Sequence, residues 1–359
     1  MKAEQKDGFL SFSIGAFIYS MRLALALSCF AILLGERNTV ISTSSIFSVC
    51  GWLPWWDFER AVGEFIGNTD TLDIASPFVF TLESSGDIHL KALAFEQKLS
   101  DLKSVSRLVI PSINNEFDGI RVSNIINSEQ KSNKHIGELV QLVEKYALDG
   151  IELDYEFLLE EDMAAYNRFA ELLSEELHKR TKLLIITLHP KTEGEGIWHG
   201  TRAQDWKTLS RFADYLRIMA YDYRWETSPS GPIAPLNWFE DVISYALETI
   251  PLEKIILGLG LYGYNWANDG SPAQALTLQE THDLAIEQNA DILFDKKNYS
   301  SYFVYENEGK SHSVWLESVE SVDEKLSVVI HNNITGICIW RLGGVPDNYY
   351  RIIKERFSQ

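Results

Sequence analysis

The stretch LDGIELDYEF, residues 148–157, places four carboxylates among apolar side chains: Asp149, Glu152, Asp154 and Glu156. If the stretch is a β-strand, its side chains alternate, so that Glu152, Asp154 and Glu156 share one face. Neighbouring buried carboxylates cannot all ionise, because burial and like charge both raise a carboxyl pKa. A carboxylic acid that stays protonated near neutral pH is what general acid catalysis requires. The pattern therefore indicates acid catalysis.

The elements that position these carboxylates follow from the hydrophobic pattern. Short apolar, β-branched runs predict strands buried on both faces, and the amphipathic stretches between them predict helices. The strand-like runs are residues 46–54, 71–80, 106–113, 149–157, 182–190, 215–222, 254–266 and 336–344, and the clearest helical stretches are 136–148, 163–180 and 238–250. This alternation predicts an α/β fold, the (β/α)8 or TIM barrel, whose active sites form at the carboxyl ends of the strands. Of the three inward carboxylates, Glu156 is nearest that end.

One interval breaks the alternation. Residues 267–331 are longer and mixed, and they contain YSSYFVYENEGKSHSVWLES, which has the pattern of a β-hairpin with its turn at ENEGK. We expect a small α+β insertion of about residues 267–331 between the seventh and eighth strands. Residues 45–359 are then one barrel domain.

The N-terminal region has a different composition. Residues 9–34 are apolar except for Arg22, which would cost about 2.5–3.5 kcal/mol near the centre of a membrane span. Met21 and Arg22 followed by twelve apolar residues have the size of a signal peptide. We expect residues 1–44 to be a signal peptide or membrane anchor with a linker, and the barrel to be exported, either secreted or held at the membrane through residues 9–34. The alternative is a misassigned start on a cytoplasmic protein.

Charge and composition narrow the partners. A formal net charge of −19 argues against nucleic acid and anionic membrane surfaces as partners. The eight histidines and three cysteines show no ligand spacing, so we expect no metal and no cofactor.

Cys50 and Cys338 fall on the first and eighth strands, which are neighbours in a closed barrel. A disulfide there is conceivable, but two free thiols are the more ordinary outcome. We expect a monomer.

The carboxylate stretch resembles the DxxDxDxE signature of glycoside hydrolase family 18, the chitinase-like barrels. Asp149, Asp154 and Glu156 match it, whereas Glu152 stands where that family usually has aspartate. The segment IMAYD, residues 218–222, is similar to the family's MxYD segment.

Two further segments carry the same likeness. ICIWRLGG places Trp340 where the family has a tryptophan under the bound sugar, and WLPWW resembles the family's first strand. The resemblance spans about residues 48–357, and its pattern is most similar to bacterial spore-germination and cell-wall hydrolases.

The resemblance implies a retaining, substrate-assisted hydrolysis, in which the N-acetyl oxygen of the sugar attacks the anomeric carbon. Glu156 would then be the general acid, Asp154 would orient the acetamido group, and Tyr221 would hydrogen-bond its oxygen. Glu152 would share a proton with Asp154. The catalytic residues expected are Glu156, Asp154 and Tyr221, the supporting residues Glu152, Asp149, Asp222 and Met219, and the substrate-binding residues Trp340, Trp52, Tyr262, Tyr264 and His189.

The substrate implied is a β-linked, N-acetylglucosamine-containing glycan, such as chitin oligomers or peptidoglycan. Two other functions stay open. One is a sugar-binding barrel without activity, since Glu152 is one methylene longer than the usual aspartate and could displace Asp154. The other is a glycosidase with two catalytic carboxylates, which would need a second one about 5–5.5 Å from the first. Asp222 is the candidate for it.

Overall fold

The computed structural model describes residues 48–194 and 196–357, so the expected signal peptide or anchor in residues 1–44 lies outside the described residues. The described chain forms the expected barrel of eight parallel strand positions, which closes because the first strand pairs with both the second and the last. In chain order the barrel strands are β1 Ser48–Pro54, β2 Ile74–Leu82, β4 Leu108–Val109 with β5 Ser112–Asn114, β6 Gly150–Asp154, β7 Leu183–Leu188, β8 Tyr215–Ile218, β9 Ile255–Gly260 and β15 Gly336–Trp340.

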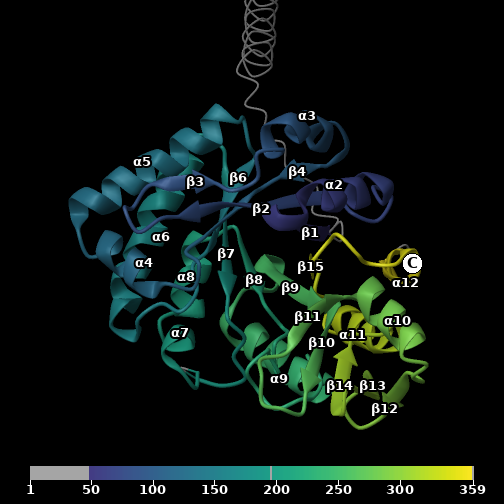
Figure 1. The fold of residues 1–359 in the computed structure, drawn as a ribbon. Helices are drawn as coiled ribbons and strands as arrows, with labels where there is room; N and C mark the ends of the chain where they lie inside the picture. Colours follow the sequence, from purple (N-terminus) through teal and green to yellow (C-terminus); the bar gives the residue numbers. More distant parts are fainter. Residues whose placement is uncertain (1–47, 195, 358–359) are drawn as a thin grey trace, which may run out of the picture. The chain divides into compact units, whose positions relative to one another are not determined.

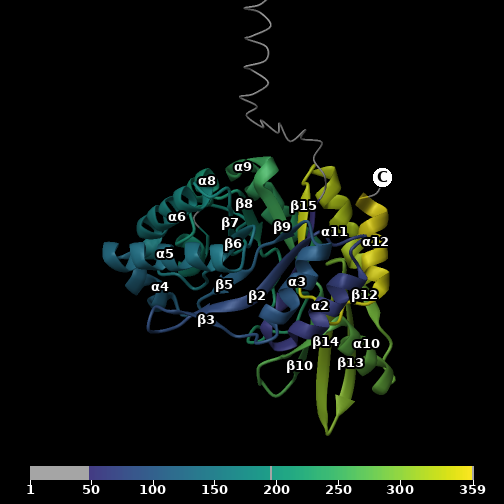
Figure 2. The ribbon, with the colours of Figure 1, turned by 90° about the horizontal axis from the view of Figure 1, so that it is seen from above.

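Helices cover the outside of this barrel (Figures 1 and 2). A short strand, β3 Ile88–Leu90, pairs antiparallel with the end of β2. The helices are α2 Phe58–Gly67, α3 Phe95–Val105, α4 Gly119–Ile126, α5 Glu129–Lys145, α6 Met163–His178, α7 His199–Arg202, α8 Trp206–Phe212, α9 Leu236–Thr249, α10 Leu278–Glu287, α11 Val319–His331 and α12 Asp347–Phe357, with single 3-10 turns at Trp55–Asp57, Glu160–Asp162 and Leu252–Lys254.

The strands bury apolar side chains on both faces, as their continuous apolar runs predict. On β6, Ile151 and Leu153 and the following Tyr155 belong to the large cluster between strands and helices. A second cluster, which includes Trp52 and Tyr221, fills the barrel interior. The alternation along β6 therefore turns Glu152 and Asp154 toward the interior, away from the helix-facing residues.

The insertion is a five-stranded antiparallel sheet with α10 packed on it, seen at the lower right in Figure 1. Its strands are β10 Tyr262–Ala267, β11 Gln274–Thr277, β12 Leu293–Asp295, β13 Ser300–Asn307 and β14 Lys310–Leu316. The hairpin β13–β14 turns at Glu308 and Gly309, both with positive φ, inside the expected ENEGK segment.

The bounds of the insertion differ from the expected residues 267–331. Its sheet already begins at Tyr262, because β9 ends at Gly260 and the N–H of Leu261 donates to the Trp340 carbonyl. The run 254–266 stays apolar across this break, since the first insertion strand also faces the barrel interior. At the other end, α11 contacts α9 and α12 and so belongs to the helices around the barrel.

Two smaller findings concern thiols and membranes. Cys50 and Cys338 lie opposite each other in the β1–β15 register, and both are buried free thiols, so no disulfide joins them. Among the helices of residues 48–194 and 196–357, none has the length and apolar character of a membrane span.

Candidate active site

The three inward carboxylates occupy successive depths along β6. Glu152 is fully buried, Asp154 is 6% exposed, and Glu156 lies just beyond the last residue of the strand. The register places Glu152 beside Ser112 on β5 and Ile185 on β7, so it lies low in the barrel. Glu156 therefore reaches the carboxyl end, where the loops of a barrel build its site.

Glu152 is held by donors from four strands. Its Oε2 accepts from Trp52 Nε1 at 3.0 Å, Ser112 Oγ at 2.5 Å and an Arg217 Nη at 2.7 Å, and its Oε1 accepts from Thr187 Oγ1 at 2.7 Å. One guanidinium donor and three neutral donors thus occupy both oxygens of this carboxyl group, and the bond to the guanidinium is charge-assisted. This arrangement disfavours the expected sharing of a proton with Asp154, because the extra methylene takes the carboxylate to Arg217 instead.

Asp154 and Glu156 are suited to hold a proton. Burial raises the pKa of Asp154 well above its ordinary value, the negative charge of Glu152 raises it further, and Arg217 opposes the shift. Burial also raises the pKa of Glu156 well above its ordinary value, with smaller contributions from Asp154 and Asp222. One Asp154 oxygen, Oδ1, is buried without a hydrogen-bond partner among the described residues. The pair thus offers a protonated acid and a free acceptor.

The backbone of Glu156 is fixed by the side chain of Asn115, which the sequence analysis missed. The Oδ1 atom of Asn115 accepts from the Glu156 N–H at 2.9 Å, and its Nδ2 donates to the Glu156 carbonyl at 2.8 Å. The paired residues of β5 and β6 end at Asn114 and Asp154, two residues before Glu156. The side-chain amide of Asn115 therefore bonds the β6 segment to the β5 segment beyond the end of the sheet and holds the backbone of the acid in place.

Two glycines make room for Tyr221, which is 5% exposed and follows β8. A Cβ on Gly258 would lie 2.9 Å from Tyr221 Cε1, and one on Gly260 would lie 2.9 Å from Tyr221 Cβ. Both glycines are on β9, the neighbour of β8 in the sheet. Only the absence of side chains there lets the tyrosine ring fill the barrel interior. Met219 is half-buried and packs against the same interior cluster.

Asp222 links the site to the insertion. It adopts a left-handed backbone conformation, φ +58°, and accepts hydrogen bonds from the hydroxyls of Tyr262 and Tyr264 on β10. Desolvation by the surrounding protein raises the pKa of Asp222 to about 6, while the two hydroxyls oppose the shift. Its side chain still reaches solvent, so water screens part of this effect. Tyr262 and Tyr264 are thereby oriented from the insertion toward the site.

Trp340 ends β15 inside a group of aromatic rings. Its ring centroid lies 5.4 Å from that of Phe78, 5.9 Å from Trp52 and 6.2 Å from Trp56. Trp52, which the sequence analysis expects to bind substrate, is 2% exposed and its indole N–H donates to Glu152, so in this structure it contacts the carboxylate row. Trp55 and Trp56, 40% and 48% exposed, are the tryptophans of the first loop that reach solvent.

The chain after Trp340 is held by Glu64 on α2, which the sequence analysis also missed. The Oε2 atom of Glu64 accepts from the backbone N–H groups of Gly343, Gly344 and Val345 at 2.6–3.3 Å. Its Oε1 accepts from the Tyr350 hydroxyl at 2.5 Å. No local pattern could reveal this contact, because Glu64 is about 280 residues away along the chain.

The two remaining expected residues have different surroundings. His189 is 7% exposed, and burial first, then His199, lowers the pKa of His189 to about 3, so it is neutral beside Glu156. Its Nε2 lies 3.7 Å from Glu156 Oε2, too long for a hydrogen bond. Asp149 accepts from the Val109 backbone N–H at 2.7 Å. Its role is therefore to join β6 to β4 rather than to contact substrate.

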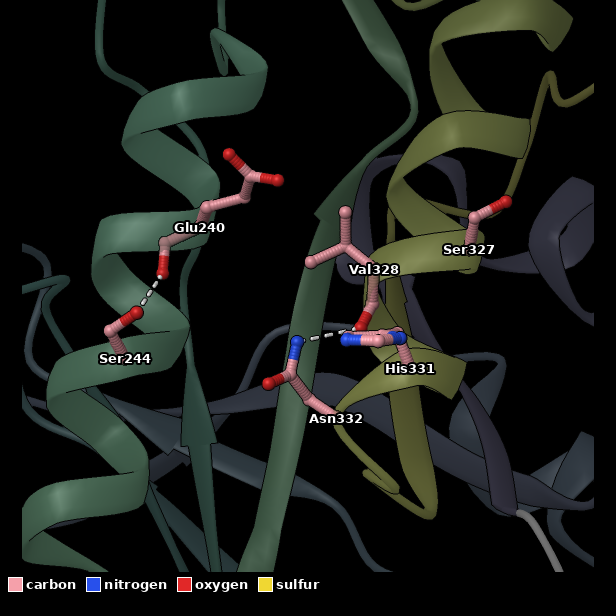
Figure 3. A pocket seen from close by; sticks show the side chains of 6 residues that line it. All are labelled: Glu240, Ser244, Ser327, Val328, His331 and Asn332. Atoms are coloured by element: carbon pink, nitrogen blue, oxygen red, sulfur yellow. Dashed lines mark hydrogen bonds between the residues drawn. The ribbon is translucent and has the colours of Figure 1, made fainter.

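A pocket lies on the outside of the barrel, between α9 and α11, away from the carboxylate row (Figure 3). It is lined by Glu240, Ser244, Ser327, Val328, His331 and Asn332. Its hydrogen bonds stay within each helix, as Ser244 donates to the Glu240 carbonyl and Asn332 to that of Val328. None of the residues around Glu156 lines it. In residues 48–194 and 196–357, no three His, Cys, Asp or Glu side chains gather as metal ligands would.

The chain is similar to known proteins over most of its length. The sequence profile of the family "Glycosyl hydrolases family 18" matches residues 73–344. The cortical fragment-lytic enzyme of Bacillus anthracis is 30% identical over 289 residues, which cover 78% of this chain and 67% of that protein. The crystal structure of the Bacillus cereus spore cortex-lytic enzyme SleL is 26% identical, with a TM-score of 0.79 and coverage of 87% and 74%.

A chitinase from Chromobacterium violaceum, 22% identical with a TM-score of 0.80, covers 87% of this chain and 99% of its own and shares the fold. The profile match takes in the carboxylate strand β6, the Tyr221 segment and Trp340. The chain therefore belongs to glycosyl hydrolase family 18 and is a glycosidase that acts on O-glycosyl bonds.

Proposed function

We propose that this glycosidase hydrolyses β-linked, N-acetylglucosamine-containing glycans by a substrate-assisted, retaining mechanism. The observation that carries the proposal is the pair of Asp154 and Glu156 at the open end of β6. Both carboxyls have a raised pKa, and Asp154 keeps one buried oxygen without a partner. A single protein acid and one acceptor for an acetamido N–H are what substrate assistance requires.

The reaction proceeds in two steps. The acetamido oxygen attacks the anomeric carbon while Glu156 gives its proton to the leaving glycosidic oxygen, which yields an oxazolinium ion and frees the first product. Asp154 accepts a hydrogen bond from the acetamido N–H and stabilises the positive charge. Water then attacks the anomeric carbon, the bond between this carbon and the acetamido oxygen breaks, and Glu156 takes up a proton from the attacking water. Two inversions at one carbon give net retention.

Neighbouring residues position the sugar in this scheme. Tyr221 presents its hydroxyl beside the acetamido oxygen, and the apolar face of Trp340 lies under the ring and the acetyl methyl. His189 is neutral, so it does not favour the ionised form of Glu156 as a nearby imidazolium cation would. Trp55 and Trp56 add exposed aromatic surface at the end of β1, where further sugars can stack.

Of the candidate substrates, we favour peptidoglycan over chitin. The support comes from sequence: two relatives about 30% identical, from Bacillus anthracis and Bacillus cereus, are named for lysis of cortical fragments. The chitinases among the curated relatives are less similar, at 22–23% identity.

The test compares purified peptidoglycan with chitotriose as substrates for the full chain and its Glu156→Gln variant. Glutamine keeps the size of the side chain but has no proton to give. We expect soluble muropeptide release from peptidoglycan that the variant reduces at least 1,000-fold, with slower cleavage of chitotriose. If the unaltered chain binds both glycans but releases no product from either, the protein is instead a sugar-binding barrel.

We further propose that the barrel acts outside the cytoplasm. The apolar run of residues 9–34 supports this. Expression of the full chain in a bacterium, followed by protease treatment of intact cells, tests it. Digestion of the barrel in intact cells is expected, and protection until the cells are lysed would contradict export.

A further inference from the structure

Arg217 is a fully buried arginine in the barrel interior that the reaction described above does not use. It lies on β8, opposite Thr187 on β7 and Ile256 on β9. One of its Nη atoms donates to Glu152 Oε2 at 2.7 Å and to Ser76 Oγ at 2.6 Å. Its guanidinium carbon lies 5.4 Å from the centroid of the Trp52 ring. Arg217 and Glu152 therefore form an ion pair that water does not reach.

Stability alone does not account for this pair. Burying a guanidinium and a carboxylate costs several kcal/mol per ion, and well-packed apolar residues in their place are often as stable or more so. The pair is also incompletely bonded, because Nε and the other Nη of Arg217 have no hydrogen-bond partner among the described residues. Glu152 lies two residues before Asp154 on β6, and the charges of Glu152 and Arg217 both act on the pKa of Asp154, the first raising it and the second lowering it.

We propose that Arg217 is a positioning residue that holds Glu152 as a permanent anion, so that the one proton of the carboxylate row is confined to Asp154 and Glu156. The inference rests on the proposed function. In this arrangement Glu152 does not relay protons. Its charge disfavours a second anion at Asp154, and the charge of Arg217 offsets part of this effect.

Charge arithmetic makes the inference testable. The unaltered pair contributes no net charge below Asp154. Glu152→Gln leaves the charge of Arg217 alone there, which favours ionised Asp154 and lowers its pKa. Adding Arg217→Met removes that charge and restores neutrality. The ionisable groups that face Asp154, or its neighbours Glu156 and Arg217, are Glu152, Tyr221, Tyr166, Asp222, His189, Cys50 and Cys338, and all but the substituted pair stay the same.

The first experiment measures kcat/KM against pH on the glycan substrate. Its acid limb reports the uptake of a second proton by the Asp154–Glu156 pair. We expect Glu152→Gln to move this limb to lower pH by about one unit, and the double variant Glu152→Gln/Arg217→Met to return it close to the original position. Thr187→Val, which removes one neutral donor to Glu152, is expected to reduce stability and leave the limb in place.

The second experiment needs neither activity nor a variant. Carbon-13 labelling of the glutamate and aspartate carboxyls allows each titration to be followed by NMR in the unaltered chain. Glu152 is expected to keep the chemical shift of an anion throughout the range in which Asp154 and Glu156 titrate. A Glu152 shift that moves together with that of Asp154, or an acid limb that the double variant fails to restore, would overturn the inference. If the chain hydrolyses no glycan but the Glu152 chemical shift stays that of an anion, the proposed function is refuted and the inference about Arg217 stands.

Discussion

Asn115 offers a sharp test of how the acid is positioned. Asn115→Ala removes both hydrogen bonds from the side-chain amide to the Glu156 peptide, one to its N–H and one to its carbonyl. The residue is fully buried. A buried backbone group that loses its partner costs about 1–3 kcal/mol, so two such groups predict a loss of about 2–6 kcal/mol in the free energy of unfolding, measured by urea denaturation.

The effect on rate is expected to exceed the effect on stability. Freed from the amide, the Glu156 backbone can shift, and a displacement of about 1 Å at a reacting group costs about 100-fold. We expect kcat on the glycan to fall about 10- to 100-fold, with KM changed less than about threefold, because the proposed contact of the sugar with Trp340 does not involve Asn115. Initial rates over a range of substrate concentrations, at a temperature where the variant stays folded, separate the two constants.

The control is Asn332→Ala. The side chain of Asn332 makes one hydrogen bond, from its Nδ2 to the Val328 carbonyl at 2.9 Å, on the outside of the barrel. We expect it to reduce stability slightly and to leave kcat unchanged. The reasoning is refuted if Asn115→Ala loses the stability worked out above while its kcat stays within twofold of the unaltered enzyme.

Three other predictions follow from buried groups. Glu64→Gln replaces a carboxylate that accepts hydrogen bonds from three backbone N–H groups. We expect the free energy of unfolding, measured by urea denaturation, to fall by about 1.5–3 kcal/mol, and KM to rise by a larger factor than kcat falls. An unchanged KM would contradict the role given to Glu64 in holding the chain after Trp340. Gly258→Ala places a Cβ 2.9 Å from Tyr221 Cε1 and is expected to cost about 1–3 kcal/mol and at least tenfold in kcat, whereas Gly137→Ala, where a Cβ meets nothing within 4 Å, is expected to leave kcat unchanged. Burial lowers the pKa of His135 to about 4, below its unfolded value of about 6.5. Between these two pH values the unfolded chain binds a proton that the folded chain does not, so the free energy of unfolding falls as pH falls. The loss relative to neutral pH is about 3 kcal/mol at pH 4. The His135→Phe/Tyr155→Phe variant, which removes the 2.7 Å contact between His135 Nε2 and the Tyr155 hydroxyl, is expected to lose that share of the pH dependence, and an unchanged pH profile of urea midpoints would contradict it.

The barrel and the row of carboxylates could be predicted because both depend on local periodicity. The expected strand runs each overlap a barrel strand, and alternation on β6 alone placed Glu152 and Asp154 in the interior. The insertion bounds could not be predicted in the same way. The run 254–266 remains apolar where β9 ends and β10 begins, so hydrophobicity does not mark the break.

The groups that hold the site in place depend on contacts between distant segments. Arg217 reaches Glu152 across 65 residues, Asn115 reaches Glu156 across 41 and Glu64 reaches Gly344 across 280. Arg217 is a charged residue inside the apolar run YLRIMAYD, which marks it in the sequence as unusual. The sequence does not show that its partner is Glu152. The hydrogen bond from the Trp52 indole N–H to Glu152 could not be predicted for the same reason, since the two residues lie on different strands and 100 residues apart in the chain.

The most direct test of the central claim follows the substrate's own acetamido group. Proton NMR would record the anomeric configuration of the first product from an N-acetylated glycan and compare its rate of release with that from the matching de-N-acetylated glycan. We expect a β-configured first product and a rate at least 1,000-fold lower without the acetyl group. An α-configured first product, or comparable cleavage of both glycans, would contradict substrate assistance through Asp154 and Glu156.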